Sequence, residues 1–309
     1  MRLGVLDIGS NTVHLLVAEA QPGGRPLART SEKSTLRLMR YLEDDGRISD
    51  AGVKAIVDAV TRAREVAEKE GVDELLATAT SAVREATNGA DVILQIEAAV
   101  GQPLQVLGDE QEARFTFLAV RRWFGWSAGR ILLFDIGGGS LEIAGGSEEL
   151  PEIAESVQLG AGRMTVAFLP DDPPGDDQVD RLRAHAASVL APVAERFAAL
   201  PRAEHVVGSS KTIRSLARLA GHPMPGWSGI ERMVLRRDAL GSWIPVLARI
   251  PAKARRELPG ITPDRTFQIT AGAVVLHEAM TALGVEEIEV SPWALREGVL
   301  LRYIEDLGW

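Results

Sequence analysis

The chain has 309 residues, which is enough for two domains of about 150 residues each. Its hydrophobic fraction of 46% excludes a disordered chain, and the absence of cysteine excludes disulfides, thiol nucleophiles and cysteine zinc sites. The formal net charge of −9 argues against a general nucleic-acid binder, so an anionic substrate has to be held by local arginines, backbone N–H groups or metal ions.

Strand-like and helix-like segments alternate from the first residues onward, which is typical of an α/β fold. Buried strands at Leu3–Ile8 and Thr12–Ala18 flank the tight turn Gly9-Ser10-Asn11. The other elements predicted in this half are a helix that begins at Ser49 or Asp50 and ends at Gly71, a strand at Glu74–Thr80, and helices that end near Asn88-Gly89, at Gly101 and at Gly125.

The pattern restarts near the middle of the chain. A buried strand at Arg130–Asp135 leads into a turn with three glycines and then into a strand at Leu141–Ala144. Asp7-Ile8-Gly9-Ser10 thus returns as Asp135-Ile136-Gly137-Gly138, which indicates a duplicated domain. The later predicted elements are loops at 171–175, 223–226 and 259–263, helices at 213–220, 267–283 and 293–307, and a strand at 287–291.

The first of these turns carries candidate phosphate ligands. A buried strand delivers Asp7 to its end, and the N–H groups and hydroxyls of Ser10, Asn11 and Thr12 can then face an anion. An ordinary hairpin turn is the alternative.

The second turn is more informative. Three consecutive glycines cost conformational entropy, so a fold retains them where the backbone itself requires glycine. The leading reason is close approach of the backbone to a phosphate. A glycine-rich bulge at a sheet edge is the alternative. Asp135 and Glu142 lie on either side of the turn and can face one site, where their hard oxygens suit Mg²⁺ or Mn²⁺.

Three further segments place polar residues at helix starts. The loop after Gly208 leads into a helix whose free N–H groups suit a phosphate, although capping by Ser209 or Ser210 is the alternative. Arg84 lies at a helix start, where a positive charge opposes the helix dipole. Either a contact with phosphate or an ion pair with a nearby carboxylate can explain this position. Glu112 lies three residues after an aspartate, so it is either a partner in a capping box or a general base.

Taken together, these segments resemble the exopolyphosphatase / guanosine pentaphosphate phosphohydrolase (Ppx/GppA) family of the sugar kinase–Hsp70–actin superfamily. In detail the chain is similar to the short actinobacterial exopolyphosphatases, which lack the C-terminal HD-like region. The segments that carry the resemblance are Asp7–Thr12, Ala79–Arg84, Glu112–Arg114, Asp135–Glu142, Gly208–Ile213 and Ala294–Gly298.

The resemblance implies two RNase H-like domains, residues 1–125 and 126–309, that flank a cleft, with the final helix at about 293–309 able to pack back on the first domain. It implies hydrolysis of terminal phosphoanhydride bonds of inorganic polyphosphate and release of orthophosphate. The net charge of −9 should repel a long polyanion, so we expect short chains to be favoured. Guanosine pentaphosphate 5′-phosphohydrolase is the alternative. An ATP-dependent kinase or a non-catalytic sensor of the same superfamily is more remote.

Residue by residue, Glu112 matches the catalytic glutamate that activates water, Glu142 the second essential glutamate, and Asp135 the aspartate at the metal. The resemblance also implies Mg²⁺ or Mn²⁺, with Asp7 as a further candidate ligand, and a homodimer. We expect a cytoplasmic protein without nucleic-acid or membrane partners. The implied phosphate contacts are Ser10, Asn11, Thr12, Arg84, Gly138, Gly139, Ser140, Gly208 and Ser209. The chain departs from the family pattern at Gly108-Asp109 and at Ser210-Lys211.

Overall fold

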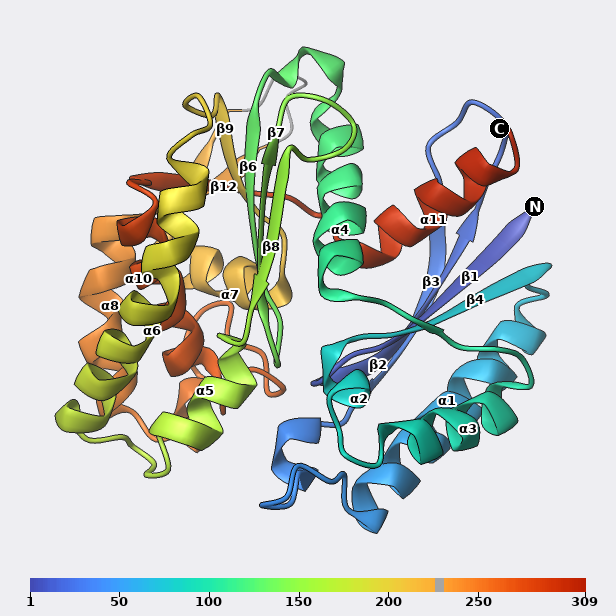
Figure 1. Cartoon of the computed structure of the whole chain (residues 1–309), viewed down its shortest axis with the longest axis horizontal. Coiled ribbons are helices and arrows are strands. Elements are labelled where there is room, and N and C mark those ends of the chain that lie inside the picture. The colour runs from blue at the N-terminus through green and yellow to red at the C-terminus, as the bar shows by residue number, and fades with distance from the viewer. Residues whose placement is uncertain (226–230) are drawn as a thin grey trace. The chain divides into compact units, whose positions relative to one another are not determined.

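The computed structural model of the protein describes residues 1–225 and 231–309, which form two compact units (Figure 1). One unit comprises Met1–Ala119 together with Leu295–Trp309, and the other comprises Val120–Ala294. The division falls inside helix α4 (Asp109–Phe124), whereas the boundary predicted between residues 125 and 126 lies in the loop that follows this helix. The segment after Leu295 belongs to the first unit.

The first unit is built on a five-stranded mixed sheet with the order β3-β2-β1-β4-β5. Strand β2 is antiparallel to both β1 and β3, whereas β4 is parallel to β1 and β5 is parallel to β4. The strands are β1 (Arg2–Ile8), β2 (Thr12–Glu19), β3 (Leu27–Thr35), β4 (Glu74–Ala79) and β5 (Gln105–Val106).

The central strand β1 is a near-continuous apolar run because both of its faces are covered. Leu6 and Ile8 pack in the core that α1 and α3 cover, whereas Leu3 and Val5 pack with residues of α11. Side chains alternate along a strand, so Asp7 lies on the α11 face. The helices of this unit are the 3₁₀ turn η1 (Leu38–Tyr41), α1 (Asp50–Lys69), α2 (Ser81–Arg84), α3 (Gly89–Val100), α4 and α11 (Leu295–Asp306).

The predicted ends of helix α1 are confirmed. The Ser49 side chain caps its start by accepting a hydrogen bond from the Gly52 N–H at 3.3 Å. The helix ends just before Gly71, whose φ of 64° is a left-handed conformation that glycine adopts without strain.

Helices α11 and α4 approach each other closely at a glycine. A Cβ added to Gly298 would lie 1.9 Å from the Phe115 carbonyl oxygen, so any larger residue at this position would push the two helices apart. Because α4 carries Glu112, the last helix of the chain fixes part of the frame that holds this glutamate.

The second unit is built on a seven-stranded sheet with the order β10-β11-β12-β9-β6-β7-β8. The run β8-β7-β6-β9-β12 repeats the order and the strand directions of the first sheet, and β11 and β10 extend it as antiparallel strands. The duplicated α/β fold that the repeated turn predicts is therefore confirmed. The strands are β6 (Ile131–Ile136), β7 (Leu141–Gly146), β8 (Ile153–Val157), β9 (His205–Gly208), β10 (His222–Met224), β11 (Arg232–Arg236) and β12 (Glu287–Val290).

Helix α10 is the centre of this unit. It is buried along most of its length and packs against α5, α6, α7 and α8, which explains its mainly apolar sequence. The helices are the 3₁₀ turn η2 (Trp126–Ala128), α5 (Ala161–Phe168), α6 (Asp176–Phe197), α7 (Lys211–Ala220), α8 (Arg237–Arg249), α9 (Ala252–Arg255) and α10 (Ile269–Ala282).

The prediction of a loop at residues 223–226 is wrong for its first two residues, which lie in a strand. Residues His222–Met224 form the edge strand β10, a place where Pro223 is tolerated because an edge strand does not need every N–H for pairing. Gly226, at the end of that prediction, lies outside the described residues. Within residues 1–225 and 231–309, no helix is both long and apolar enough to cross a membrane.

Candidate active site

The turn between β6 and β7 brings two carboxylates together. Asp135 and Glu142 are directly opposite each other in the antiparallel ladder, so their side chains are neighbours on one face of the sheet. The Ser156 hydroxyl, on the adjacent strand β8, donates a 3.0 Å hydrogen bond to Glu142 Oε1. The Ser209 hydroxyl donates to Asp135. Both predicted acidic residues are thus placed side by side and held by serines.

Burial makes this pair unusual. Glu142 is 4% exposed, and loss of hydration raises the pKa of its carboxyl to about 8, with a further rise from the negative charge of Asp135. Hydrogen bonds from Ser140 and Ser156 act in the opposite direction. Two adjacent buried carboxylates are stable with a shared proton or with a cation between them, so the pair suits a hard divalent ion.

Two of the three metal ligands expected from the sequence, Asp135 and Glu142, lie side by side in one unit. Among the described residues, no group of three acidic or histidine side chains converges on one point. Asp135 and Glu142 form a pair in the second unit, and Asp7 belongs to the first unit. Its role as a metal ligand stays a prediction.

The three glycines of the second turn are held from behind by the start of α5. The Gly137, Gly138 and Gly139 carbonyl oxygens accept hydrogen bonds of 2.9–3.1 Å from three N–H groups at this helix start, those of Ala161, Arg163 and Gly160 respectively. In a planar trans peptide, the C=O of one residue and the N–H of the next point in opposite directions.

The N–H groups of Gly138, Gly139 and Ser140 therefore point away from α5. Three successive N–H groups on one side of a turn form an anion-binding nest, which is the arrangement predicted for the phosphate loop. The approach of α5 requires glycine as well, because a Cβ on Gly160 would lie 2.2 Å from the Gly139 carbonyl carbon.

The first turn repeats this geometry in the other unit. The Gly9 N–H donates to the Thr12 carbonyl at 3.0 Å, just as the Gly137 N–H donates to Ser140 at 2.9 Å. The Ser10 and Asn11 carbonyls accept N–H groups of residues 36–38, so the N–H groups of Asn11 and Thr12 point the other way. Asn11 and Thr12, two of the predicted phosphate residues, thus present their N–H groups on one side of the turn.

Several polar atoms at the first turn lack an internal partner. Asp7 Oδ1 and both polar side-chain atoms of Asn11 are buried and have no hydrogen-bond partner among the described residues. Asp7 Oδ2 lies 3.3 Å from an Arg296 nitrogen of α11. Burial raises the pKa of Asp7, and Arg296 partly offsets this effect. Unpaired buried polar atoms are costly, so their presence here favours a ligand-binding role.

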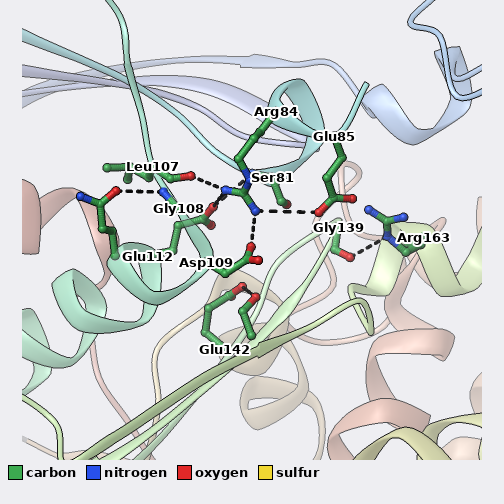
Figure 2. A network of polar contacts seen from close by, with 12 residues as sticks. Ser81, Arg84, Glu85, Leu107, Gly108, Asp109, Glu112, Gly139, Glu142 and Arg163 are labelled. Atoms are coloured by element: carbon green, nitrogen blue, oxygen red, sulfur yellow. Dashed lines mark hydrogen bonds and ion pairs between the residues drawn. The ribbon is translucent and has the colours of Figure 1, made fainter. Parts of the chain in front are cut away.

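Glu112 is held by the short helix α2. Its Oε1 accepts the N–H of Ser81 at 3.1 Å and lies 3.5 Å from an Arg84 nitrogen (Figure 2). Gln111, not Glu112, makes the reach-back contact of a capping box, through its Oε1 to the Gly108 N–H at 2.9 Å. Glu112 is 7% exposed and faces α2, which places a buried carboxylate next to a helix start and a guanidinium.

Arg84 is the centre of an ion-pair network. It bonds the Leu107 carbonyl and the Asp109 carboxylate and also lies beside Glu112 (Figure 2). The ion pair that the sequence offered as one explanation for this arginine is confirmed. A contact with phosphate stays a prediction.

The third loop divides its roles among neighbouring residues. Ser210 caps α7 by accepting the Ile213 N–H at 3.1 Å, so the capping alternative is confirmed for this residue. Ser209 is fully buried and turns to Asp135 instead. Lys211 pairs with Asp264 at 3.0 Å. Phosphate contacts by Gly208 and Ser209 stay predictions.

Four residues that the sequence patterns did not predict support the site from behind. These are Ser156, Gly160, Arg163 and Arg296. Arg296 lies in one of the segments that carried the resemblance, so a signal for it existed. Ser156 could have been found from strand pairing, because it is opposite Glu142, but the β8 strand was not predicted.

Comparisons with known proteins show the family of the chain. The model of the Ppx/GppA phosphatase family matches residues 16–306. Exopolyphosphatase 1 of Mycobacterium tuberculosis is 47% identical over 306 residues, which cover 99% of this chain and 89% of that protein. The crystal structure of the Aquifex aeolicus Ppx/GppA family member is 25% identical with a TM-score of 0.80, and the match covers 100% of this chain and 99% of that one.

The crystal structure of an exopolyphosphatase from Cytophaga hutchinsonii is similar in fold, with a TM-score of 0.87 at 24% identity, over 99% of this chain and 98% of that one. These solved structures have the actin-like, RNase H-like fold, which agrees with the duplicated strand order of the two sheets. The family match begins within β2, after the first turn, and covers the glycine turn 137–140 and the last helix. The chain belongs to the Ppx/GppA phosphatase family.

Proposed function

We propose that this protein is an exopolyphosphatase, which hydrolyses the terminal phosphoanhydride bond of inorganic polyphosphate and releases orthophosphate. The observation that carries the proposal is the glycine turn 137–140, with its N–H groups turned to one side and an acidic pair at its base. The mycobacterial relative named exopolyphosphatase 1, 47% identical over nearly the whole chain, supports the choice of substrate.

Phosphoanhydride hydrolysis depends on positioning and on charge stabilisation more than on covalent catalysis. The N–H groups of Gly138, Gly139 and Ser140 would bind phosphate oxygens in a fixed geometry. Glu112 would accept a proton from the attacking water as the general base. The Ser81 N–H and the Arg84 guanidinium hold its Oε1 in one orientation.

We also propose that Mg²⁺ or Mn²⁺ binds at Asp135 and Glu142. The support is the buried pair itself, because burial beside Asp135 raises the pKa of Glu142 to about 8 and so disfavours two uncompensated negative charges. Asp7, with one buried and unpartnered carboxylate oxygen, is a further candidate ligand. When bound, the ion would neutralise charge on phosphate oxygens.

The test of function is orthophosphate release from tripolyphosphate, long polyphosphate, guanosine pentaphosphate and ATP, measured side by side. We expect polyphosphate to be the best substrate. Faster release from guanosine pentaphosphate would instead favour the alarmone phosphatase, and no release from any of them would favour a sensor. Phosphate transfer from ATP to an added acceptor would indicate a kinase.

The role of Glu112 is tested with a matched pair on the same helix. Glu112→Gln should keep the fold and lower kcat by about 10²–10⁴-fold, because the amide cannot act as a base. Glu110→Gln is the control, since Glu110 is exposed and pairs with Arg114. Near-normal turnover by Glu112→Gln would show that this glutamate only supports the structure.

We further propose that short chains are preferred. A formal net charge of −9 should repel the distant part of a long polyanion, so affinity should come from the few phosphates at the two turns. Gel analysis of partly digested long polyphosphate should show a ladder of intermediates. Full-length chains coexisting with orthophosphate alone would show processive digestion and contradict this.

Two proposals remain, and the first of them rests on the family resemblance. We propose a homodimer, to be tested by sedimentation at micromolar protein, where a monomer would contradict it. We also propose a cytoplasmic location, to be tested by cell fractionation.

A further inference from the structure

Arg163, in the first turn of α5, contacts the phosphate turn in two ways. Its backbone N–H donates to the Gly138 carbonyl at 2.9 Å, and its side-chain Nε donates to the Gly139 carbonyl at 2.9 Å (Figure 2). One residue thus holds two successive carbonyls of the turn. No sequence motif pointed to this arginine.

The side-chain contact acts on a single peptide group. The Gly139 carbonyl belongs to the same rigid plane as the Ser140 N–H, so its direction sets the direction of that N–H. Gly139 has no Cβ and can rotate through conformations that other residues avoid. A flip of this peptide would turn the carbonyl oxygen, instead of the N–H, toward a bound phosphate.

We propose that Arg163 is a positioning residue that locks the Gly139–Ser140 peptide in the phosphate-binding orientation. The Gly160 N–H also reaches the Gly139 carbonyl, at 3.1 Å, but a neutral backbone donor makes a weaker bond than a guanidinium. The arginine therefore supplies the stronger of the two bonds that resist the flip. This inference rests on the proposed function of the turn as a phosphate site.

Side-chain geometry offers a matched set of variants. The amide nitrogen of glutamine occupies the same place along the side chain as the Nε of arginine, so Arg163→Gln keeps a donor for the Gly139 carbonyl and removes the charge. Arg163→Met has a methyl group at that place and cannot donate. Arg163→Lys keeps the charge but places its nitrogen one atom further out. Arg181→Met is the surface control, because Arg181 is 59% exposed and pairs with Asp177 within α6.

The first readout is steady-state hydrolysis of tripolyphosphate. Arg163→Met should raise KM by about tenfold, with a smaller change in kcat, because the turn binds the phosphate before and during the reaction. Arg163→Gln should recover part of this loss, because its amide is a donor but an uncharged one, and Arg181→Met should match the unchanged protein. A normal KM in Arg163→Met would overturn the proposal, and so would equal damage in the Gln and Met variants.

The second readout is independent of turnover. Inorganic phosphate binding, measured by calorimetry, should weaken by about tenfold in Arg163→Met and recover partly in Arg163→Gln. If the unchanged protein does not hydrolyse polyphosphate, the proposed function fails, and phosphate binding still decides the role of Arg163. If Arg163→Met does not fold, the comparison of Arg163→Gln with Arg163→Lys decides it. Tighter phosphate binding in the lysine variant would show that charge, not the hydrogen bond, matters and would overturn the lock.

Discussion

The buried acidic pair makes the stability of the metal-free protein depend on pH. Burial beside Asp135 raises the pKa of Glu142 from its ordinary value of 4.5 to about 8. Each pKa difference of one corresponds to about 1.4 kcal/mol, so this site contributes up to about 5 kcal/mol to the pH dependence of the unfolding free energy. Relaxation of the site will lower this, and we expect a measured effect of about 2–4 kcal/mol.

The sign of the effect follows from proton binding. Between pH 4.5 and about 8, the folded protein holds a proton on Glu142 that the unfolded chain releases. The contribution of Glu142 to the unfolding free energy is therefore fully present below pH 4.5 and is lost as the pH rises through 8. A divalent ion that binds the ionised pair should reverse the loss, by about 2.7 kcal/mol at a concentration 100 times its Kd.

The assay is urea unfolding of the chelated protein from pH 5 to pH 8.5, compared with Glu142→Gln. The glutamine variant cannot titrate at this position, so the difference between the two proteins isolates Glu142 from all other groups. Glu195→Gln, an exposed position on α6, is the control and should follow the unchanged protein. Parallel pH profiles for the unchanged protein and Glu142→Gln would refute the reasoning, as would a stabilisation by Mg²⁺ that is no larger at pH 8 than at pH 5.

Three other predictions follow from the contacts around the site. Chelation should abolish orthophosphate release, and Mg²⁺ or Mn²⁺ should restore it; full activity after exhaustive chelation would exclude the metal proposal. Gly298→Ala should lower the unfolding free energy by about 1–3 kcal/mol, because its Cβ would overlap the Phe115 carbonyl, whereas Gly24→Ala has room and should have little effect in the same urea titration. Ser210→Ala should lower the unfolding free energy by about 0.5–2 kcal/mol through loss of the α7 cap, and an unchanged Tm would contradict this role of Ser210.

The duplicated fold could be predicted from sequence because its signal is local. The Asp-Ile-Gly turn occurs twice, and each copy follows an apolar strand that is buried on both faces. The strand order then repeats around each turn. The ends of α1 were predictable for the same reason, since Ser49 and Gly71 act through their own backbone neighbourhood.

Other elements could not be predicted because tertiary packing determines them. Helices α6 and α8 each contain an internal proline, at Pro192 and Pro245, which local rules treat as a helix breaker. Their apolar faces are buried against α10, and this packing outweighs the local cost. The edge strand β10 contains Pro223 and exists through its pairing with β11.

In the candidate site, too, some residues could be predicted from local patterns and others could not. The residues that present donors or charges lie in short motifs, so Glu112, Glu142 and the glycine turn were identified from sequence. The residues that hold them come from distant segments. Ser81 is 31 residues from Glu112, and the Arg163 contact with Gly139 spans 24 residues. No pattern in the sequence joins such pairs.

The two copies of the turn differ in the charge beside their aspartate, and this difference gives each turn its own chemistry. Across the ladder from Asp135 stands Glu142, whereas the residue in the same place opposite Asp7 is His14. The charge of Asp7 is met by Arg296, which lies 3.3 Å from its carboxylate. The second turn thus joins two carboxylates that favour a divalent cation, and the first joins a carboxylate to an arginine with no second acid opposite it in the ladder. A duplicated backbone therefore presents N–H groups on one side of a turn twice, while the acidic pair that suits a metal lies at the second turn.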